Sequence, residues 1–370
     1  MTFYFIPFIF LTILTEIETS QRFDSLIKNK YLYSLIAILF IIFVGLRYEI
    51  GCDWEQYVKT FEKYSPNMIE IIKRGLFEKH IYGIYQELGH IFITKISQNI
   101  YVLNLIYSIL FLLPLFYFCS TLKRRYFSLL IAYPYYIVVI GMGPIRQAAC
   151  ISFLMLSILL VSKKKYYLSF IISSFSFLIH QFSILFNGLI FCSSFTNIKK
   201  IKLTRKIIFL LIVVSLVFLY SLPSIISKFS IYFTLYKKLD QNGIMLVAPA
   251  KSAILIWIMN FIPSLIFIKN KRKFNLNNNL NTIFTSFCIS AILLLPIVLV
   301  QSVVGYRLLL YIFPTSIYIT SLIPDLYFLN IKKEYMVNTI ISIAFASLIF
   351  WLKFAYHSSC WVPYKNILFN

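Results

Sequence analysis

An arginine stands at a break between two long apolar runs of this sequence. The break, residues 141–147, reads GMGPIRQ, and the flanking runs 127–140 and 148–161 contain no charged residue. A guanidinium is costly beside hydrocarbon and stays charged at any physiological pH, so function usually maintains it there. Arg146 is therefore the first candidate for a functional residue.

Three other sites have the same character: Arg47 with Asp53, His180, and Arg307. Arginines bind phosphate oxygens bidentately, whereas a carboxylate or a neutral imidazole can take a proton from a hydroxyl group. Together these residue types suit an anionic lipid headgroup, bound either as a ligand or as a leaving group. What the chain does depends on where the four sites lie relative to a bilayer.

The composition predicts a membrane protein. The chain has 370 residues, of which 60% are hydrophobic and 13% charged, and its mean hydropathy is +0.81, values that no soluble globular protein of this length would have. About 20 apolar residues cross a bilayer core, so the length allows roughly ten to twelve crossings. Residues 2–14 lack the basic region and cleavage pattern of a signal peptide and are expected to stay as a helix. The net charge of +22 is interpreted as topological anchoring.

Short basic connections set the predicted topology. Cytoplasmic loops carry an excess of Lys and Arg, so each of these clusters should face the cytoplasm, with two crossings between successive clusters. The clusters are Arg22/Lys28/Lys30, Lys123/Arg124/Arg125, Lys163/Lys164/Lys165, residues 199–206, residues 269–273 and Lys332/Lys333. We predict an all-α polytopic integral membrane protein of about twelve transmembrane helices with both termini extracytoplasmic. The expected helices lie near 2–15, 31–46, 100–119, 126–140, 147–161, 166–180, 182–196, 207–222, 252–268, 282–300, 308–323 and 336–352.

Two regions fit this topology less well. The helices at 166–180 and 182–196 are short, covering roughly 22 Å each at 1.5 Å per residue. Residues 82–97 are moderately apolar but contain Glu87, His90 and Lys95. A crossing here would make the number of crossings between two cytoplasmic clusters odd, so we predict an external interfacial helix. The domain prediction is a single membrane domain over 1–370, with extracytoplasmic loops at 47–99 and 223–251 and a cytoplasmic linker at 269–281.

On this topology all four polar sites lie at the outer ends of helices, although the basic clusters alone were used to assign it. Each residue also has a plainer interpretation. An arginine at a helix end often snorkels, and a lone His180 is more often a hydrogen-bonded core residue. Asp53 could cap a turn, Tyr57 could pack at the interface, and Gln147 could bond a neighbouring helix.

Several chemistries lack their motifs. The sequence contains no Walker nucleotide motif, no HExxH, no DxD and no GxSxG. We therefore predict no metal and no cofactor, and no nucleic-acid partner, because a soluble basic surface is missing.

The six cysteines show no metal-binding spacing, and most lie in apolar runs. Cys52 and Cys360 are the two in predicted external segments. A disulfide between them is left open by the sequence, and we do not predict one.

At these polar residues the chain resembles the EpsG-like branch of the Wzy polysaccharide polymerases. The resemblance covers residues 31–370, and Cys52 departs from the small or hydroxyl residue more usual in the family. The matching segments are GLRYEIGCDWEQY (45–57), IRQAA (145–149), LIHQFS (178–183), YR (306–307) with Tyr311, and the closing WVPYKNI (361–367).

The resemblance implies a glycosyltransferase that joins repeat units, as in O-antigen or capsule synthesis, at the outer face of the bacterial inner membrane. Donor and acceptor glycans would both be linked to polyprenyl diphosphate, and a chain-length regulator would be a partner. The catalytic residues would be His180 or Asp53 as base, with Arg146 and Arg307 on the diphosphate. The substrate-binding residues would be Arg47, Gln147, Tyr57 and Tyr311.

Rival functions remain at this stage. A lipid-linked oligosaccharide flippase would need cationic residues through a central cavity, and the inner halves of these helices carry almost none. An O-antigen ligase usually shows its dominant external loop late in the chain, whereas the longest one here is early. A membrane acyltransferase would be expected to carry a paired histidine–acid motif.

Overall fold

The structure is a computed structural model, which describes residues 1–20, 24–64, 87–196, 230, 253–326 and 332–368. Within those residues the regular secondary structure is helical, apart from one isolated antiparallel bridge between Arg47 and Asn366. The chain divides into two compact units. Unit 1 comprises Met1–Met68, His90–Leu156 and Ser316–Asn370, and unit 2 comprises Ile69–Gly89 and Ser157–Thr315.

Among the described residues, seven helices are long and apolar enough to cross a membrane: Thr2–Ser20, Ile100–Ser120, Ile145–Ser162, Ala253–Phe274, Asn278–Val300, Ser302–Asp325 and Lys333–Phe354. Shorter apolar helices are Lys30–Gly45, Arg125–Ile140, Tyr166–Ile179 and Ser183–Cys192. The elements of the described residues are thus helical, as in a multi-pass membrane protein. The number of twelve spans and the side of each terminus stay predictions, because the expected helix at 207–222 lies outside the described residues.

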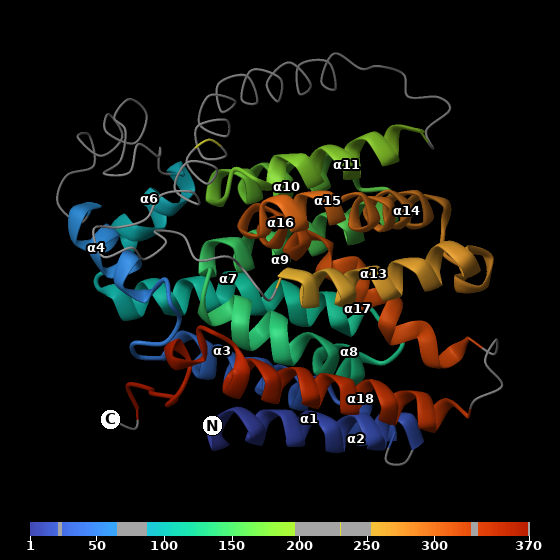
Figure 1. Cartoon of the computed structure of the whole chain (residues 1–370), viewed down its shortest axis with the longest axis horizontal. Helices are drawn as coiled ribbons and strands as arrows, with labels where there is room; N and C mark the ends of the chain where they lie inside the picture. The colour runs from blue at the N-terminus through green and yellow to red at the C-terminus, as the bar shows by residue number, and fades with distance from the viewer. Residues whose placement is uncertain (21–23, 65–86, 197–229, 231–252, 327–331, 369–370) are drawn as a thin grey trace. The chain divides into compact units, whose positions relative to one another are not determined.

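Unit 1 contains the amino-terminal helices and the end of the chain (Figure 1). Its elements are α1 (Thr2–Ser20), α2 (Asp24–Lys28), α3 (Lys30–Gly45), α4 (Trp54–Tyr64), most of α6 (Leu88–Ile96), α7 (Ile100–Ser120), α8 (Arg125–Ala132), the π-helix η1 (Tyr133–Ile140), the start of α9 (Ile145–Ser162), the end of α17 (Phe313–Leu322), η4 (Ile323–Asp325), α18 (Lys333–Ile349), η6 (Phe350–Phe354) and η7 (Ser358–Cys360).

The surface of α1 explains why this unit needs a bilayer. One stripe of the helix, with Tyr4, Phe8 and Leu11, is buried against unit 1. The other face exposes large apolar side chains such as Ile6 and Ile9, which are 57% and 53% exposed. A water-facing helix would carry polar residues there, so this face is suited to lipid.

Hydrogen bonds place the basic residues of unit 1 at one end of its helices. The Glu18 carboxylate, near the end of α1, accepts the N–H groups of Tyr126 and Phe127 at 3.2 and 3.1 Å, in the first turn of α8. These are N–H groups that a helix start leaves without an intrahelical partner. Arg125 donates to the Asn29 carbonyl at 3.3 Å, just before α3. We call this end, with Lys28, Lys30, Lys123, Arg124, Arg125, Lys332 and Lys333, the basic end.

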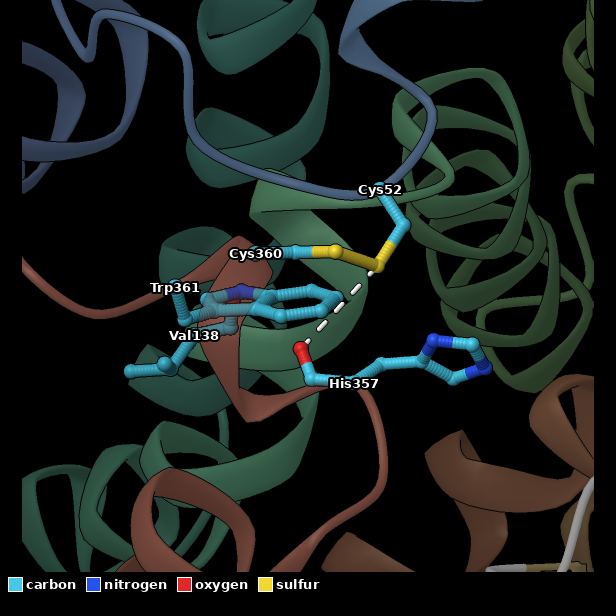
Figure 2. Close-up of a disulfide and its surroundings, with 5 residues drawn as sticks. All are labelled: Cys52, Val138, His357, Cys360 and Trp361. Atoms are coloured by element: carbon cyan, nitrogen blue, oxygen red, sulfur yellow. Dashed lines mark hydrogen bonds between the residues drawn. A yellow bond between two sulfur atoms is a disulfide. The ribbon is translucent and has the colours of Figure 1, made fainter.

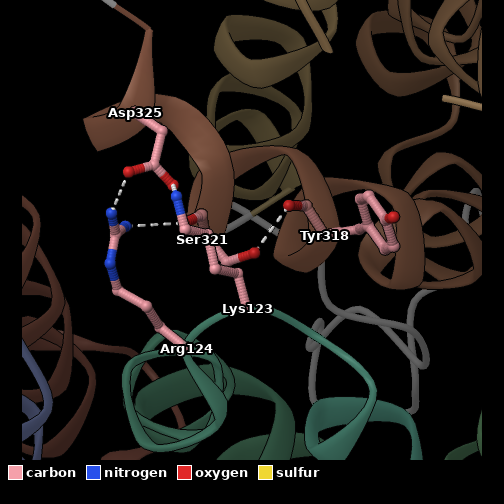
Figure 3. Close-up of polar contacts among 5 residues, drawn as sticks. All are labelled: Lys123, Arg124, Tyr318, Ser321 and Asp325. Atoms are coloured by element: carbon pink, nitrogen blue, oxygen red, sulfur yellow. Dashed lines mark hydrogen bonds and ion pairs between the residues drawn. The ribbon is translucent and has the colours of Figure 1, made fainter. Parts of the chain in front are cut away.

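An ion pair joins the same end to η4 (Figure 3). The Arg124 side chain, 3% exposed, pairs with Asp325 and also donates to the Ser321 carbonyl at 3.1 Å. Lys123 lies 3.1 Å from the second oxygen of Asp325. Asp325 therefore compensates the charge of a guanidinium that is nearly removed from water.

The opposite end of unit 1 holds the carboxy-terminal tail, residues 355–368. The Tyr4 hydroxyl, at the start of α1, donates to the Trp361 carbonyl at 2.7 Å. The Tyr364 hydroxyl donates to the Phe43 carbonyl at 2.8 Å, near the end of α3. Successive helices of unit 1 therefore run alternately between this tail end and the basic end.

Unit 2 is built from α9 onward: α10 (Tyr166–Ile179), α11 (Ser183–Thr196), α13 (Ala253–Asn270), η2 (Lys271–Phe274), α14 (Asn278–Leu293), α15 (Leu295–Val300), α16 (Ser302–Leu309), η3 (Leu310–Ile312) and the start of α17. Small polar residues pack its helices. Ser157 lies 2.6 Å from Ser169 and 2.8 Å from Ser173, oxygen to oxygen. Such residues let helix backbones approach and bond across helices in a membrane.

Several predicted bounds need correction. In the described part of the segment 82–97 a helix, α6, begins at Leu88, and its external, interfacial place stays a prediction. The predicted loop at 47–99 also contains α4. The helix expected at 308–323 begins at Ser302, so Arg307 lies inside α16 and not at its start. The segment 223–251 lies outside the described residues except for Ser230. The linker at 269–281 joins α13 to α14 through η2.

The Arg124–Asp325 pair supplies a stability test. Asp325→Asn removes the counter-charge of a buried guanidinium, and we expect a loss on the order of 3 kcal/mol, the lower end for breaking a buried pair. The measurement is the thermal midpoint of the purified protein in detergent. Glu49→Gln, which breaks the exposed Glu49–Lys365 pair, is the control and should leave the midpoint nearly unchanged. Equal midpoints for the two variants would contradict the interpretation.

Candidate functional site

Arg47 is the most enclosed charged residue of the described chain. It follows α3, is 1% exposed, and spreads its hydrogen bonds over separate segments. Nη1 donates to Val44 O at 2.7 Å, Nε to Met142 O at 3.2 Å and Ile50 O at 3.3 Å, and Nη2 to Asn104 Oδ1 at 3.2 Å. A guanidinium suits this role because its N–H donors are spread over three nitrogens, whereas all the donors of a lysine are on one nitrogen.

The cost of enclosing this charge is offset by oriented dipoles. Burial lowers the pKa of Arg47 to about 10, which still leaves the guanidinium protonated at neutral pH. Val44 O belongs to the last turn of α3, where helix carbonyls lack intrahelical partners and carry partial negative charge. Asp53 is not among the hydrogen-bond partners of Arg47. The predicted contact of Arg47 with a substrate stays a prediction, and what the geometry shows is a residue that fixes backbone.

The loop after α3, residues 46–53, turns sharply against the break before α9. Gly51 has φ of +96°, and a Cβ there would lie 2.1 Å from the Met142 carbonyl oxygen. No residue with a side chain fits at such a distance, so the close approach requires glycine. Asp53 directly precedes α4, and its carbonyl accepts the Tyr57 N–H at 3.0 Å. The position of Asp53 is therefore compatible both with capping the start of α4 and with the predicted role as a base.

Arg146 lies in the first turn of α9 and is half-buried. Its guanidinium carbon lies 5.7 Å from the centroid of the Tyr57 ring, which is 5% exposed. The amino-terminal end of a helix has partial positive charge, and a guanidinium adds a full one, so the two favour an anion at the same place. Gln147, the next residue, is 1% exposed.

A histidine that the sequence did not indicate as a site residue, His90, lies beside the same tyrosine. His90 is 1% exposed, and its Nδ1 lies 2.8 Å from the Tyr107 hydroxyl. The ring centroids of His90 and Tyr57 are 6.1 Å apart in an edge-to-face arrangement. Its sequence context, a moderately apolar segment, gave no sign of this pairing, because it depends on how α4, α6 and α7 pack.

Unit 2 holds a second imidazole–phenol pair. His180 ends α10, is 5% exposed, and its Nδ1 lies 2.7 Å from the Tyr311 hydroxyl. Tyr311 is fully buried and stacks on Phe186 at 4.9 Å. Arg307, half-buried on α16, precedes Tyr311 by one helical turn and so shares its face. His180 and Tyr311, which were predicted separately as site residues, are therefore in contact, and the phenol orients the imidazole ring.

Cys52 and Cys360 form a disulfide, which we did not predict (Figure 2). Their sequence separation of 308 residues gave no signal, since two cysteines so far apart meet only through the tertiary structure. The ligand atoms of these cysteines and His357 lie within 4.8 Å of one another. Thiolates are the sulfur ligands of metals, and neither sulfur is a thiolate while the disulfide is intact.

The predicted site residues thus fall into two sets. Unit 1 brings together Arg47, Asp53, Tyr57, Arg146 and Gln147 on the loop 46–53, α4 and the start of α9. Unit 2 brings together His180, Arg307 and Tyr311. Each set contains an arginine, an aromatic residue and a residue that could accept a proton, and the roles of these residues in binding and proton exchange stay predictions.

Comparison with known proteins gives one match. A family model described as the EpsG family matches residues 30–366, which is most of the chain. Neither the curated proteins nor the solved structures that were searched contain a match.

Arg47 supplies the test of this geometry. Arg47→Lys keeps the charge but cannot serve the same set of acceptors, so buried carbonyls lose their donors. We expect a loss of stability on the order of 3 kcal/mol, read as a fall in the thermal midpoint in detergent. Arg272→Lys, on exposed η2, is the matched control and should melt as the wild type does. An unchanged midpoint for Arg47→Lys would show that the guanidinium is not what fixes the loop.

Proposed function

The chain belongs to the EpsG family, and from this premise we propose that it polymerises oligosaccharide repeat units carried on polyprenyl diphosphate. Membership of that family suggests a polysaccharide polymerase-like membrane protein with glycosyltransferase-like activity. The finer proposal is a Wzy-type reaction that extends an O-antigen or capsule chain. The observation that carries it is Arg146 in the first turn of α9, beside a turn that the buried Arg47 holds in place.

The reaction joins two lipid-linked glycans. A hydroxyl oxygen of the acceptor sugar forms a bond to the anomeric carbon of the donor, and the bond from that carbon to the diphosphate oxygen breaks. The hydroxyl proton passes to a base, and polyprenyl diphosphate leaves with the bonding electrons. Because the diphosphate is already an activated leaving group, the scheme calls for no nucleotide or metal ion.

Arginine residues would stabilise the leaving group. Negative charge grows on the diphosphate as the bond breaks, and donors fixed beforehand in a partly dehydrated site stabilise such charge strongly. We assign Arg146 and Arg307 to the diphosphate, with the positive end of α9 supporting Arg146. Arg47 would act through the backbone that it holds. Gln147 would orient a sugar or phosphate oxygen, and Tyr57 would keep the Arg146 guanidinium in position.

His180 is the base that the geometry favours over Asp53. Its Nδ1 lies 2.7 Å from the Tyr311 hydroxyl, and this contact orients the ring. In the tautomer whose Nδ1–H donates to that hydroxyl, Nε2 is the basic nitrogen. A general base needs such an orienting partner, as in other hydroxyl-activating sites. Asp53, at the start of α4, stays the alternative base.

Two independent features support an extracytoplasmic site in unit 1. Disulfides persist in oxidising compartments, and Cys52–Cys360 lies at the tail end. Lys and Arg accumulate on the cytoplasmic side, and the opposite end of unit 1 is the basic end. Both support the proposal that Arg146 faces outward. We therefore propose the outer face of a bacterial inner membrane as the location, with the lipid bilayer and a chain-length regulator as partners.

A gene deletion tests the activity. Surface polysaccharide would be displayed by size on a gel, and we expect the deletion to leave glycans of a single repeat unit. A flippase deletion would leave none, and a ligase deletion would leave polymer that is not attached. A full ladder of bands in the deletion strain would overturn the polymerase proposal.

Complementation then tests the residues. Arg146→Ala, Arg307→Ala and His180→Ala should each fail to restore the ladder at normal protein levels, since loss of one charge-stabilising donor costs about 10²–10³-fold in rate. Arg272→Ala is the matched control and should restore it. Restoration of full ladders by all three site variants would contradict the assigned roles.

A further inference from the structure

We propose that the carboxy-terminal tail, residues 355–368, is a positioning element for Arg146, locked in place by the Cys52–Cys360 disulfide. The tail would hold the loop 46–53 and the break 141–144 in one fixed register. This inference rests on the proposed function, because the register matters for the lipid diphosphate that Arg146 would bind.

Backbone hydrogen bonds join the tail to the loop. Ile367 N–H donates to Leu46 O at 3.0 Å, and Tyr48 N–H donates to Lys365 O at 3.1 Å, on either side of the Arg47–Asn366 bridge. Farther along the loop, Gly51 N–H donates to Cys360 O at 2.8 Å. The loop therefore runs along the tail as a strand would, although neither segment has another strand as a partner in the described chain.

The same tail contacts the break that leads into α9. Trp361 is 4% exposed, and its Nε1 donates to Val138 O at 3.0 Å (Figure 2). A Cβ on Gly143 would lie 3.2 Å from the Trp361 ring, so the indole packs directly on the turn. Gly143 stands three residues before Arg146, and a shift of the indole would move the start of α9.

The loop and the break also contact each other. Arg47 Nε bonds Met142 O, and Gly51 fits against that same carbonyl oxygen. Three segments therefore depend on one another: the tail, the loop and the break. The disulfide is the one covalent cross-link among them, because it joins the loop at Cys52 to the tail at Cys360.

Cleavage of the disulfide should therefore loosen the loop before it unfolds the bundle. Cys52 is exposed and Cys360 is partly exposed, so a reductant can reach the bond. The helices of unit 1 keep their own hydrogen bonds and apolar contacts. What is lost is the register between two arginine-bearing segments, and a 1 Å misplacement of a positioning group can lower a reaction rate about 10²-fold.

The first measurement is hydrogen exchange on the purified full-length protein, before and after dithiothreitol, with cleavage verified by alkylation. We expect exchange at the amides of Tyr48, Gly51 and Ile367 to rise by about tenfold or more. The amide of Leu46 bonds Ile42 O within α3 and is the internal reference, which should not change. Unchanged exchange at the three amides after complete reduction would overturn the inference.

The second measurement is the Kd for undecaprenyl diphosphate in nanodiscs. Reduction of the wild type should raise the Kd by about tenfold, the size expected when a hydrogen bond to a charged group is weakened. The variants Cys52→Ser, Cys360→Ser and the double variant should share that raised Kd and ignore reductant, because all three remove one bond. Cys192→Ser, an exposed free cysteine, is the matched control and should respond to reductant as the wild type does.

The outcomes separate the two proposals. Equal Kd values for oxidised and reduced wild type, with the exchange raised, would show that the tail is structural and does not position Arg146. If the oxidised wild type does not bind undecaprenyl diphosphate, the proposed function fails. The exchange measurement then still decides whether the tail holds the loop.

Discussion

The enclosed guanidinium of Arg47 is the constraint on which unit 1 depends. A charge with 1% exposure must be surrounded by acceptors, and here they come from the end of α3, the loop after it, α7 and the break before α9. Each of these segments is consequently fixed relative to the others by one side chain. Gly51 allows the loop to approach the Met142 carbonyl, and the tail supports the loop through backbone hydrogen bonds. Together they let several carbonyl oxygens converge on the Arg47 guanidinium.

Unit 2 satisfies its buried polar groups in a different way. Its serines and asparagines bond neighbouring helices, as Asn187 does with Ser173 O at 3.1 Å and Asn279 with Val161 O at 3.2 Å. These contacts are neutral and short-ranged, and they tie helices pairwise. Unit 1 has a network organised around buried arginines at both ends, whereas unit 2 has many small independent contacts, with His180–Tyr311 as its one described histidine pair.

Hydropathy and basic clusters predicted most described helices to within a few residues, because lipid requires long apolar runs and polar segments separate most of these runs from one another. The positions of Arg146 at a helix start and of His180 at a helix end followed from the same pattern. The sequence pattern did not predict the disulfide, the Arg47–Asn366 bridge or the His90–Tyr107 pair. Each of them joins residues far apart in the sequence, which hydrophobic periodicity does not relate. α4 was missed because the polar segment 54–64 carries no membrane signal, and its amphipathic face needs a partner to be recognised.

The contacts between the early segments of unit 1 and its tail have a consequence for biosynthesis. The loop that carries Arg47 emerges early from the ribosome, whereas its covalent partner Cys360 follows 308 residues later. At ordinary rates of translation that interval is about 15–60 s. During it, the guanidinium lacks the strand that later lies along its loop, and α1 lacks the Trp361 carbonyl that its Tyr4 will bond. The loop 46–53 is thus completed by residues made much later, and a chain cut before Cys360 leaves that loop without its partner.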